Sequence, residues 1–359
     1  MKAARSSNHG IALIIVMISV FVLSALAAAL AYSMKVEAKL SRNADNETQL
    51  LWLGRSGVEL ARYVLAVQRT ISAEPFDSLN QKWAGGPGGA GTSNSPIADI
   101  SLDNYQVGDG SVSVKIVDLE RKVNINTATP MMLNQGLTLV GVDSGQISYI
   151  SDAILDWIDP DDDPHMNGAE SDYYRGLDPS YSAKNGPLDD LSELLLIRGI
   201  TQDMYWGPAS TNHAGAAFQQ KDRFGRLVEP PNYPVGLQEI FTPFSTGRIN
   251  INTASATVLQ MIPGVDENIA NQIVQMRAGP DGVDGTDDDT PFNNPGELVN
   301  AGLNRALVQQ IMGFCDVRSS TFQVTVDAKI GDSHRVFHAL LGRNPGNPKD
   351  VAVLSFYWQ

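Results

Sequence analysis

Two short segments of this sequence are crowded with carboxylates, and with the glycine and proline residues that let a loop wrap around an ion. The first acidic loop covers 156–174 (DWIDPDDDPHMNGAESDYY) and the second covers 279–292 (GPDGVDGTDDDTPF). Carboxylates this close repel one another unless solvent or a cation screens them, and calcium accepts about six to eight oxygen ligands in a flexible geometry. We therefore predict two calcium ions, with ligands from Asp159, Asp161, Asp163, Asn167, Glu170 and Asp172 in the first loop, and from Asp281, Asp284, Asp287, Asp288 and Asp289 in the second.

Other chemistries fit these loops less well. Most aspartate runs are solvated turns, but two runs at equivalent points of a repeat favour calcium, although neither follows the EF-hand pattern. Zinc is disfavoured because Cys315 is the only cysteine and the five histidines are scattered. A metal-dependent hydrolase would have only His165 in the first loop and no histidine in the second. Nucleophile-elbow, phosphate-loop and dinucleotide motifs are absent from the sequence, so we predict that the protein is not an enzyme.

The overall charge argues against a nucleic-acid partner. The 359 residues carry a formal charge of −14, and binding to a phosphate backbone depends on clustered lysine and arginine. A local basic patch remains compatible with this composition. The length is sufficient for two or three compact domains.

The N-terminus predicts a membrane anchor. Residues 1–10 are polar and carry Lys2 and Arg5, whereas 11–32 (IALIIVMISVFVLSALAAALAY) are uncharged. A helix of that length rises roughly 33 Å, enough to cross the hydrocarbon layer, and the basic leader should stay cytoplasmic. Three interpretations compete: a secretory signal peptide, a plain signal anchor, and a prepilin leader cut after Gly10, where the polar leader meets the apolar helix.

The chain beyond the anchor predicts an α+β fold. Helical spacing continues over 34–67, with Leu40, Leu51, Ala61 and Val64 among charged residues. Segments 111–119, 320–330, 333–343 and 351–358 have strand character, with a hairpin turn at Gly331. We expect a long N-terminal helix packed on an antiparallel sheet. This split core, 33–119 and 318–359, is interrupted by a large, mostly helical insertion at 120–317, and the Gly/Pro/Ser-rich stretch 83–96 is predicted to be a flexible loop.

The insertion contains an internal repeat. KVNINTAT at 122–129 recurs as RININTAS at 248–255, and a Gly-Val-Asp follows each at 141–143 and 264–266. Each unit ends with a proline and a Glu-Leu pair. We predict two helix-hairpin-helix or SAM-like units, at 121–201 and 247–317, joined by a linker at 202–246.

A helix-hairpin-helix can bind DNA through the backbone of its hairpin glycine. Here Asp266 and Glu267 surround the second hairpin where lysines would be useful, and Asp143 lies at the first. We therefore expect Asn250 and Asn252 to brace helices and Gly264 to form a tight turn. A membrane-anchored DNA-binding protein of the competence type remains the alternative function.

These pieces together resemble the K-type minor pseudopilins of bacterial type II secretion. The resemblance is carried by Gly10 before IALIIV, the NINTA segments, DWIDPDDDP with AESDYY, and GPDG with DDDTPF. It implies a structural subunit at the tip of the pseudopilus, which helps initiate or cap the fibre during export of folded proteins. It also implies two calcium sites, cleavage by prepilin peptidase after Gly10 and methylation of Ile11. The implied partners are the I- and J-type minor pseudopilins, other pseudopilins and the inner-membrane assembly platform, and the globular part would be periplasmic.

One departure from the wider pilin pattern is informative. Pilin-like subunits usually carry a glutamate at the fifth mature position, where it pairs with a neighbour's N-terminal amine, whereas this sequence has Ile15 there. A buried, unpaired carboxylate would be costly, so its absence suits a subunit with no such neighbour. A subunit at the tip of the fibre has no such neighbour.

Overall fold

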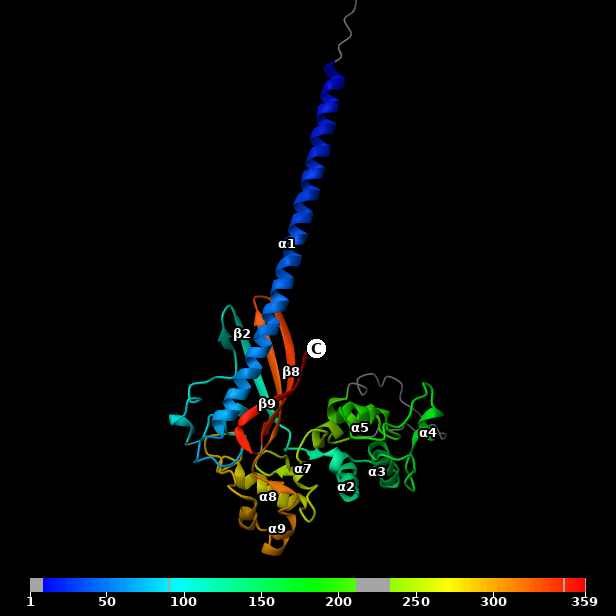
Figure 1. Ribbon diagram of the computed structural model, residues 1–359, viewed down its shortest axis with the longest axis vertical. Coiled ribbons are helices and arrows are strands. Elements are labelled where there is room, and N and C mark those ends of the chain that lie inside the picture. Colours follow the sequence, from blue (N-terminus) through cyan, green and yellow to red (C-terminus); the bar gives the residue numbers. More distant parts are fainter. Residues whose placement is uncertain (1–8, 90, 211–232, 345, 359) are drawn as a thin grey trace, which may run out of the picture.

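The computed structural model describes residues 9–89, 91–210, 233–344 and 346–358, so most of the predicted leader and part of the predicted linker lie outside the described residues. A single long helix, α1 (His9–Gln68), projects from a globular body (Figure 1). Its 60 residues correspond to about 90 Å. The apolar residues 11–32 are exposed throughout, and the globular body packs only against the second half of the helix.

The second half of α1 packs on a sheet through a regular stripe. Its buried apolar residues recur at helical spacing: Leu50, Leu53, Val58, Ala61, Val64 and Leu65. Two glycines allow the helix to approach closely, because a Cβ at Gly54 would come within 2.4 Å of the Phe337 ring and one at Gly57 within 2.4 Å of Val326. The predicted stripe begins too early, since Leu40 is 62% exposed. The helix leaves the sheet before reaching that residue.

The sheet has five antiparallel strands in the order β1-β2-β7-β8-β9. It joins segments far apart in the chain, because β2 pairs with β7 in a register that places Val114 opposite Val326. The predicted hairpin turn lies at Gly331, whose φ of 55° favours glycine. The predicted α+β fold is confirmed. The strands are β1 (Tyr105–Val107), β2 (Gly110–Asp118), β7 (Thr321–Ile330), β8 (Ser333–Asn344) and β9 (Asn347–Trp358).

The glycine-rich segment 83–96 is anchored at two points among its described residues. The short helix η1 (Lys82–Ala84) overlaps its start, η2 (Thr92–Asn94) lies within it, and the side chains of Trp83 and Thr92 are buried. The Trp83 ring meets Phe322 edge-to-face, with centroids 5.3 Å apart. Most other described residues between these two points are at least partly exposed, so a flexible loop stays a prediction for them.

The insertion forms a second hydrophobic core, separate from the core between α1 and the sheet. Each of its two units begins with a short strand and ends with a parallel partner: β3 with β4, and β5 with β6. The first unit therefore reaches Thr242, beyond the predicted boundary at 201, because its closing strand β4 lies within the predicted linker at 202–246. Its elements are β3 (Val123–Asn124), η3 (Ile125–Thr127), α2 (Pro130–Val140), α3 (Ser144–Ile158), α4 (Ser171–Arg175), η4 (Leu191–Leu196), α5 (Gln202–Trp206), η5 (Gly207–Ala209), α6 (Leu237–Ile240) and β4 (Phe241–Thr242).

The second unit repeats this plan in shorter form. Its elements are β5 (Ile249–Asn250), α7 (Ala256–Leu259), α8 (Glu267–Arg277), η7 (Pro295–Ala301), α9 (Arg305–Ile311) and β6 (Cys315–Asp316). In both units an asparagine of the NINT motif binds a backbone segment at or beyond the end of the acidic loop. Asn126 exchanges two hydrogen bonds with the backbone of Leu188, and Asn252 exchanges two with that of Phe292. The repeated motif thus anchors the last residue of the second acidic loop and, in the first unit, the segment that follows α4.

A buried polar network joins the insertion to the sheet. One oxygen of Asp118, at the end of β2, accepts hydrogen bonds from Asn250 (3.2 Å), Thr253 (2.5 Å) and Ser319 (2.7 Å). Asn250 also donates to the Asp77 carbonyl. Burial raises the pKa of Asp118, and the hydrogen bonds from Thr253 and Ser319 oppose that rise. Asn250 therefore braces the insertion against the sheet, whereas its position in the sequence predicts that it braces a helix.

Candidate metal site

The first acidic loop starts at the end of one helix and finishes at the start of another. Asp156 lies fully buried in the last turn of α3, Asp159 caps the end of that helix, and Glu170 precedes α4. An aromatic cluster packs beside the loop. The Trp157 and Tyr174 rings meet edge-to-face with their centroids 5.2 Å apart, and Tyr174 stacks on Tyr181 with the same centroid distance of 5.2 Å. The two helix ends are thereby held close together.

Carboxylates converge inside this loop, and several of their oxygens have no hydrogen-bond partner. Oxygens of Asp159, Asp161 and Glu170 all lie within 4.8 Å of one another, and Asp156, Asp159 and His165 form a second such group. Both oxygens of Glu170, which is 5% exposed, and one oxygen each of Asp156 and Asp159 are buried and have no partner. Buried polar atoms are almost always hydrogen-bonded, so these orphaned oxygens fit a bound cation.

The electrostatics of the loop point the same way. Burial, reinforced by the charges of Asp156 and Asp159, raises the pKa of Glu170 to about 7. Burial and the neighbouring Asp161 also raise the pKa of Asp159. The hydrogen bond from the ring of His165 to Asp156 raises the pKa of that histidine. Without a cation, the cluster must take up protons to relieve its own repulsion.

The predicted ligands divide into two groups. Asp159, Asp161 and Glu170 meet in the cluster, whereas three others point elsewhere: Asp163 is exposed, Asn167 donates to Asp152, and Asp172 is exposed beside Arg175.

Two further oxygen-bearing side chains near the cluster were not predicted from the sequence. Asp156 lies on the buried face of α3, where its spacing matches that of a core position. Asn185 comes from beyond the loop. Its amide nitrogen donates to the Asp161 carbonyl at 2.6 Å, while its Oδ1 is buried without a partner.

In the second acidic loop a buried arginine side chain neutralises one of the carboxylates. Arg277, the last residue of α8 and 3% exposed, binds Asp284 through two hydrogen bonds of 2.9 and 2.7 Å. Its remaining terminal nitrogen donates to the Ile251 carbonyl at 2.7 Å, which ties the loop to the NINT motif.

The other carboxylates of the second loop are mostly bonded within it. Asp289 accepts from Gly285 at 2.8 Å, Asp288 accepts from the Thr286 hydroxyl at 2.7 Å and from the Asp281 backbone at 3.0 Å, and Asp287 is exposed. Within the described part of the chain, no three acidic side chains of this loop converge as those of the first loop do. The fit to a cation is therefore clear for the first loop and weaker for the second.

The hairpins are used structurally. At the second hairpin Asp266 caps α8 by accepting from Ile269 at 2.9 Å, and a Cβ at Gly264 would come within 2.7 Å of Leu307. At the first hairpin Asp143 caps α3. Because α9 covers one hairpin glycine and an acidic residue follows each, these turns are poorly suited to a phosphate backbone.

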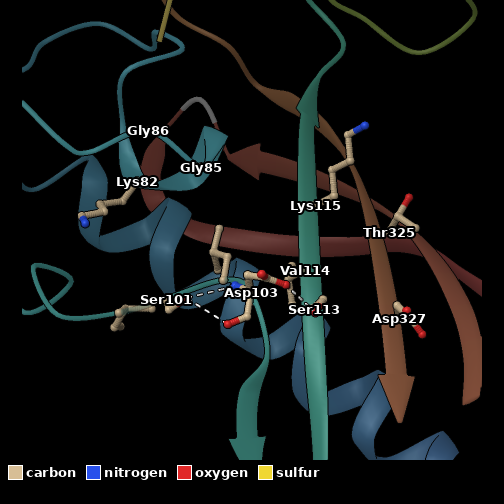
Figure 2. Close-up of a pocket in the computed structure, with 12 residues that line it drawn as sticks. Lys82, Gly85, Gly86, Ser101, Asp103, Ser113, Val114, Lys115, Thr325 and Asp327 are labelled. Atoms are coloured by element: carbon tan, nitrogen blue, oxygen red, sulfur yellow. Dashed lines mark hydrogen bonds between the residues drawn. The ribbon is translucent and has the colours of Figure 1, made fainter. Parts of the chain in front are cut away.

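A hollow on the outer face of the sheet is lined mostly by polar residues (Figure 2). It measures about 480 Å³ and is lined from β2, β7 and the segment before β1, with no histidine or cysteine among its lining residues. Asp103 lies between Ser101 and Ser113, and accepts a hydrogen bond from Ser113 at 2.8 Å. These bonds fasten the 101–104 turn to the sheet.

The predicted processing site lies in the first turn of α1, which contains Gly10, and Ile11 is 63% exposed. Among the described residues α1 is the one helix long and apolar enough to cross a membrane, with a mean hydropathy of 2.9 in its most apolar window. The fold and site together define a pilin-like subunit with an acidic helical insertion and an N-terminal helix suited to a membrane anchor.

Comparison with known proteins assigns this subunit to a family. Residues 116–206 match the family described as type II secretion system protein K, and residues 245–316 match the helix-hairpin-helix motif. The type II secretion system protein K of Pseudomonas aeruginosa is 25% identical over 94% of this chain and 90% of its own length. That of Klebsiella pneumoniae is 27% identical over 55% and 61%, and that of Pectobacterium carotovorum is 31% identical over 28% and 35%.

A solved structure shares the fold. A chain in the crystal structure of the GspK-GspI-GspJ complex from enterotoxigenic Escherichia coli matches 89% of this chain and 99% of its own length. The TM-score is 0.60 and the identity 16%. This chain belongs to the type II secretion protein K family, the K-type minor pseudopilins. The predicted family and the general function as a minor pseudopilin are thereby confirmed, and the DNA-binding alternative is not favoured.

Proposed function

We propose that this minor pseudopilin occupies the tip of the type II secretion pseudopilus and helps initiate or cap the fibre during export of folded proteins across the outer membrane. The observation that carries this is the position of the insertion. It lies at the end of the sheet farthest from the apolar half of α1 (Figure 1). If subunits pack through their apolar helices, this bulk lies where a further subunit would be added, and it would block that addition.

The tip position can be tested by imaging. Electron microscopy of fibres carrying a gold label on the exposed Met166 side of the insertion should show label at fibre ends only. Label along the fibre length would contradict the proposal. Ile15→Glu tests the charge argument separately: at the tip its carboxylate would have no neighbour's amine to pair with, so fewer fibre ends should carry the label, whereas unchanged incorporation would weaken the charge argument without affecting the steric one.

The proposed partners are the I- and J-type minor pseudopilins, with other pseudopilins and the inner-membrane assembly platform as further contacts. Support comes from the related chain that was solved in a GspK-GspI-GspJ complex. Co-purification of the three full-length proteins from detergent-solubilised membranes should give one complex. Failure to co-purify under conditions that retain the I–J pair would contradict this.

We also propose that prepilin peptidase cleaves after Gly10 and methylates Ile11, leaving a single-pass inner-membrane protein with its globular part in the periplasm. The apolar helix that starts at this boundary supports the proposal. Mass spectrometry of the mature N-terminus should find methylated Ile11. An N-terminus that keeps residues 1–10 would contradict it.

The first acidic loop is proposed to bind calcium, as a structural rather than catalytic ion. Hard carboxylate and amide oxygens of Asp159, Asp161, Glu170 and Asn185 are the ligands that calcium prefers, and Asp156 lies within reach. The second loop stays a predicted calcium site, with weaker binding expected because Arg277 already neutralises Asp284. Equilibrium dialysis should find one tight ion, and a second only at higher calcium. A chain that binds magnesium but not calcium would contradict the assignment.

A further inference from the structure

Four arginines line one cleft in a protein whose net charge is strongly negative. The cleft measures about 350 Å³ and lies where the end of α1, the second unit of the insertion and the sheet meet. Arg69 follows α1, Arg248 precedes β5, Arg318 lies between β6 and β7, and Arg343 is in β8. Four separate segments therefore bring guanidinium groups to one place.

Only two of these arginines have an acidic partner. Arg343 binds Asp77 at 2.9 Å, and Arg248 lies 3.4 Å from Asp316. Arg69 and Arg318 take part in no ion pair within the described ranges. Each donates one hydrogen bond to the Pro75 carbonyl, at 3.3 Å from Arg69 and 2.7 Å from Arg318. Because the bond from Arg318 uses its Nε, both of its terminal nitrogens remain available.

The cleft also contains a buried donor without a partner. Arg343 is 6% exposed, and its Nε is buried and unbonded, although its other nitrogens bind Asp77, the Ser319 carbonyl and the Leu65 carbonyl. Leaving a charged donor unsatisfied is costly. This Nε is shielded from solvent, and the guanidinium also lies over the Phe322 ring, with its Cζ 4.9 Å from the ring centroid, so Arg343 contributes a fixed positive charge to the cleft rather than a donor.

Part of the cluster has a structural explanation. Arg343 satisfies a carbonyl in the last turn of α1, and Arg69 and Arg318 both hold the turn at Pro75. These bonds do not account for the net excess of two positive charges that the four arginines have over Asp77 and Asp316. Burial lowers the pKa of Arg69. The charges of Asp77 and Asp316 oppose this shift, whereas those of Arg318 and Arg343 reinforce it.

We propose that this arginine cleft is an oxyanion-binding site for a phosphate group, either free inorganic phosphate or a phosphomonoester. Arginine's planar fork matches phosphate geometry, and guanidinium groups approaching from four segments suit a tetrahedral anion better than a planar carboxylate. A dianion would balance the two uncompensated arginines. The volume is at the lower end of the range of about 300–1,000 Å³ for ligand pockets, so it suits a phosphate group with few further atoms.

The test is calorimetric titration of inorganic phosphate into the full-length protein in detergent micelles, at constant ionic strength and about pH 7.5, where a phosphate group is mostly a dianion. We expect saturable binding to one site. Arg318→Gln should weaken it about tenfold, because one charge-assisted interaction is lost. The matched control is Arg305→Gln, at the exposed start of α9, which makes the same charge change outside the cleft and should bind as the wild type does.

Further arms identify the ligand. Glucose 6-phosphate that binds as phosphate does would indicate a phosphomonoester, and phosphate binding alone would indicate the free ion. Glu170→Gln should not alter binding, which separates this cleft from a calcium-bound phosphate. The proposal is overturned if no saturable binding occurs, if Arg305→Gln weakens binding as much as Arg318→Gln, or if acetate binds equally well. Arg318→Gln should lower the melting temperature without phosphate only slightly, because Arg318 is exposed and loses a single hydrogen bond to the Pro75 carbonyl.

Discussion

The two acidic loops occupy equivalent places in a repeat, but the repulsion among their carboxylates is relieved in different ways. In the first loop, buried oxygens of Glu170 and Asp159 have no partner. In the second, Arg277 holds Asp284 with two hydrogen bonds, and backbone donors satisfy much of the rest. The comparison teaches that a run of aspartates does not by itself define a metal site. What matters is whether the fold provides a positive charge of its own.

A difference in helix length explains the two solutions. α3 has 15 residues and α8 has 11, although an aspartate caps the start of each. The extra turn of α3 carries Asp156 into the first loop as an additional carboxylate. The shorter α8 ends on Arg277 instead, so one unit adds a negative charge where the other adds a positive one.

The largest expected loss of stability comes from removing the guanidinium group of Arg277. Arg277→Met leaves Asp284 unpaired and the Ile251 carbonyl without its donor, and should cost about 3 kcal/mol of unfolding free energy. Urea unfolding measures this loss. Arg277→Met combined with Asp284→Asn should recover part of the stability. A loss below about 0.5 kcal/mol would contradict the role given to this pair.

Calcium removal should have the next largest effect. For calcium at about 100 times its dissociation constant, binding to the folded state contributes about 2.7 kcal/mol. The melting temperature should fall in EDTA and recover when excess calcium is restored. Unchanged melting in both conditions would remove the calcium proposal, while leaving the pilin-like fold untouched.

Single-residue variants should separate the two loops. Glu170→Gln removes a cluster ligand, so most of the calcium-dependent rise in melting temperature should disappear. Asp288→Asn makes the same change in the second loop, where that carboxylate already accepts hydrogen bonds, and should leave most of the rise intact. Equal losses in the two variants would mean that the loops contribute equally.

The smallest effect is a pH dependence of the calcium-free protein. Burial raises the pKa of Glu170 from 4.5 to about 7. The folded state therefore keeps this proton more tightly than the unfolded state does, and stability should fall as pH rises from about 4.5 to about 7. Thermal melting in EDTA across this range measures it. Glu170→Gln should flatten this part of the profile, and an unaltered slope would assign the titration to another group.

Much of the fold could be predicted from periodicity. Local patterns in which residue type determines conformation predicted three features: the apolar helix at 11–32, the β7–β8 hairpin with Gly331, and the repeated NINT motif. The buried stripe of α1 was located less well, because Leu40 has the right spacing but lies beyond the sheet. The point at which α1 begins to pack on the sheet depends on how far the strands extend along the helix, and the helical spacing of α1 does not encode that.

The candidate metal ligands of the first loop were harder to predict from the sequence, because the site depends on contacts between distant segments. Asp156 looks like a residue of the helix, and Asn185 enters the first loop from 24 residues beyond Asp161. The pairing of Arg277 with Asp284 could have been suspected from an arginine at the end of a helix beside an acidic run. Which carboxylate it would bind required the folded loop.

The most direct test of the account is anomalous diffraction from crystals of the protein grown with a lanthanide in place of calcium. The account predicts the strongest peak in the first acidic loop, bound by carboxylate oxygens of Glu170 and Asp159. A peak confined to the second loop, or none within 156–174, would contradict it.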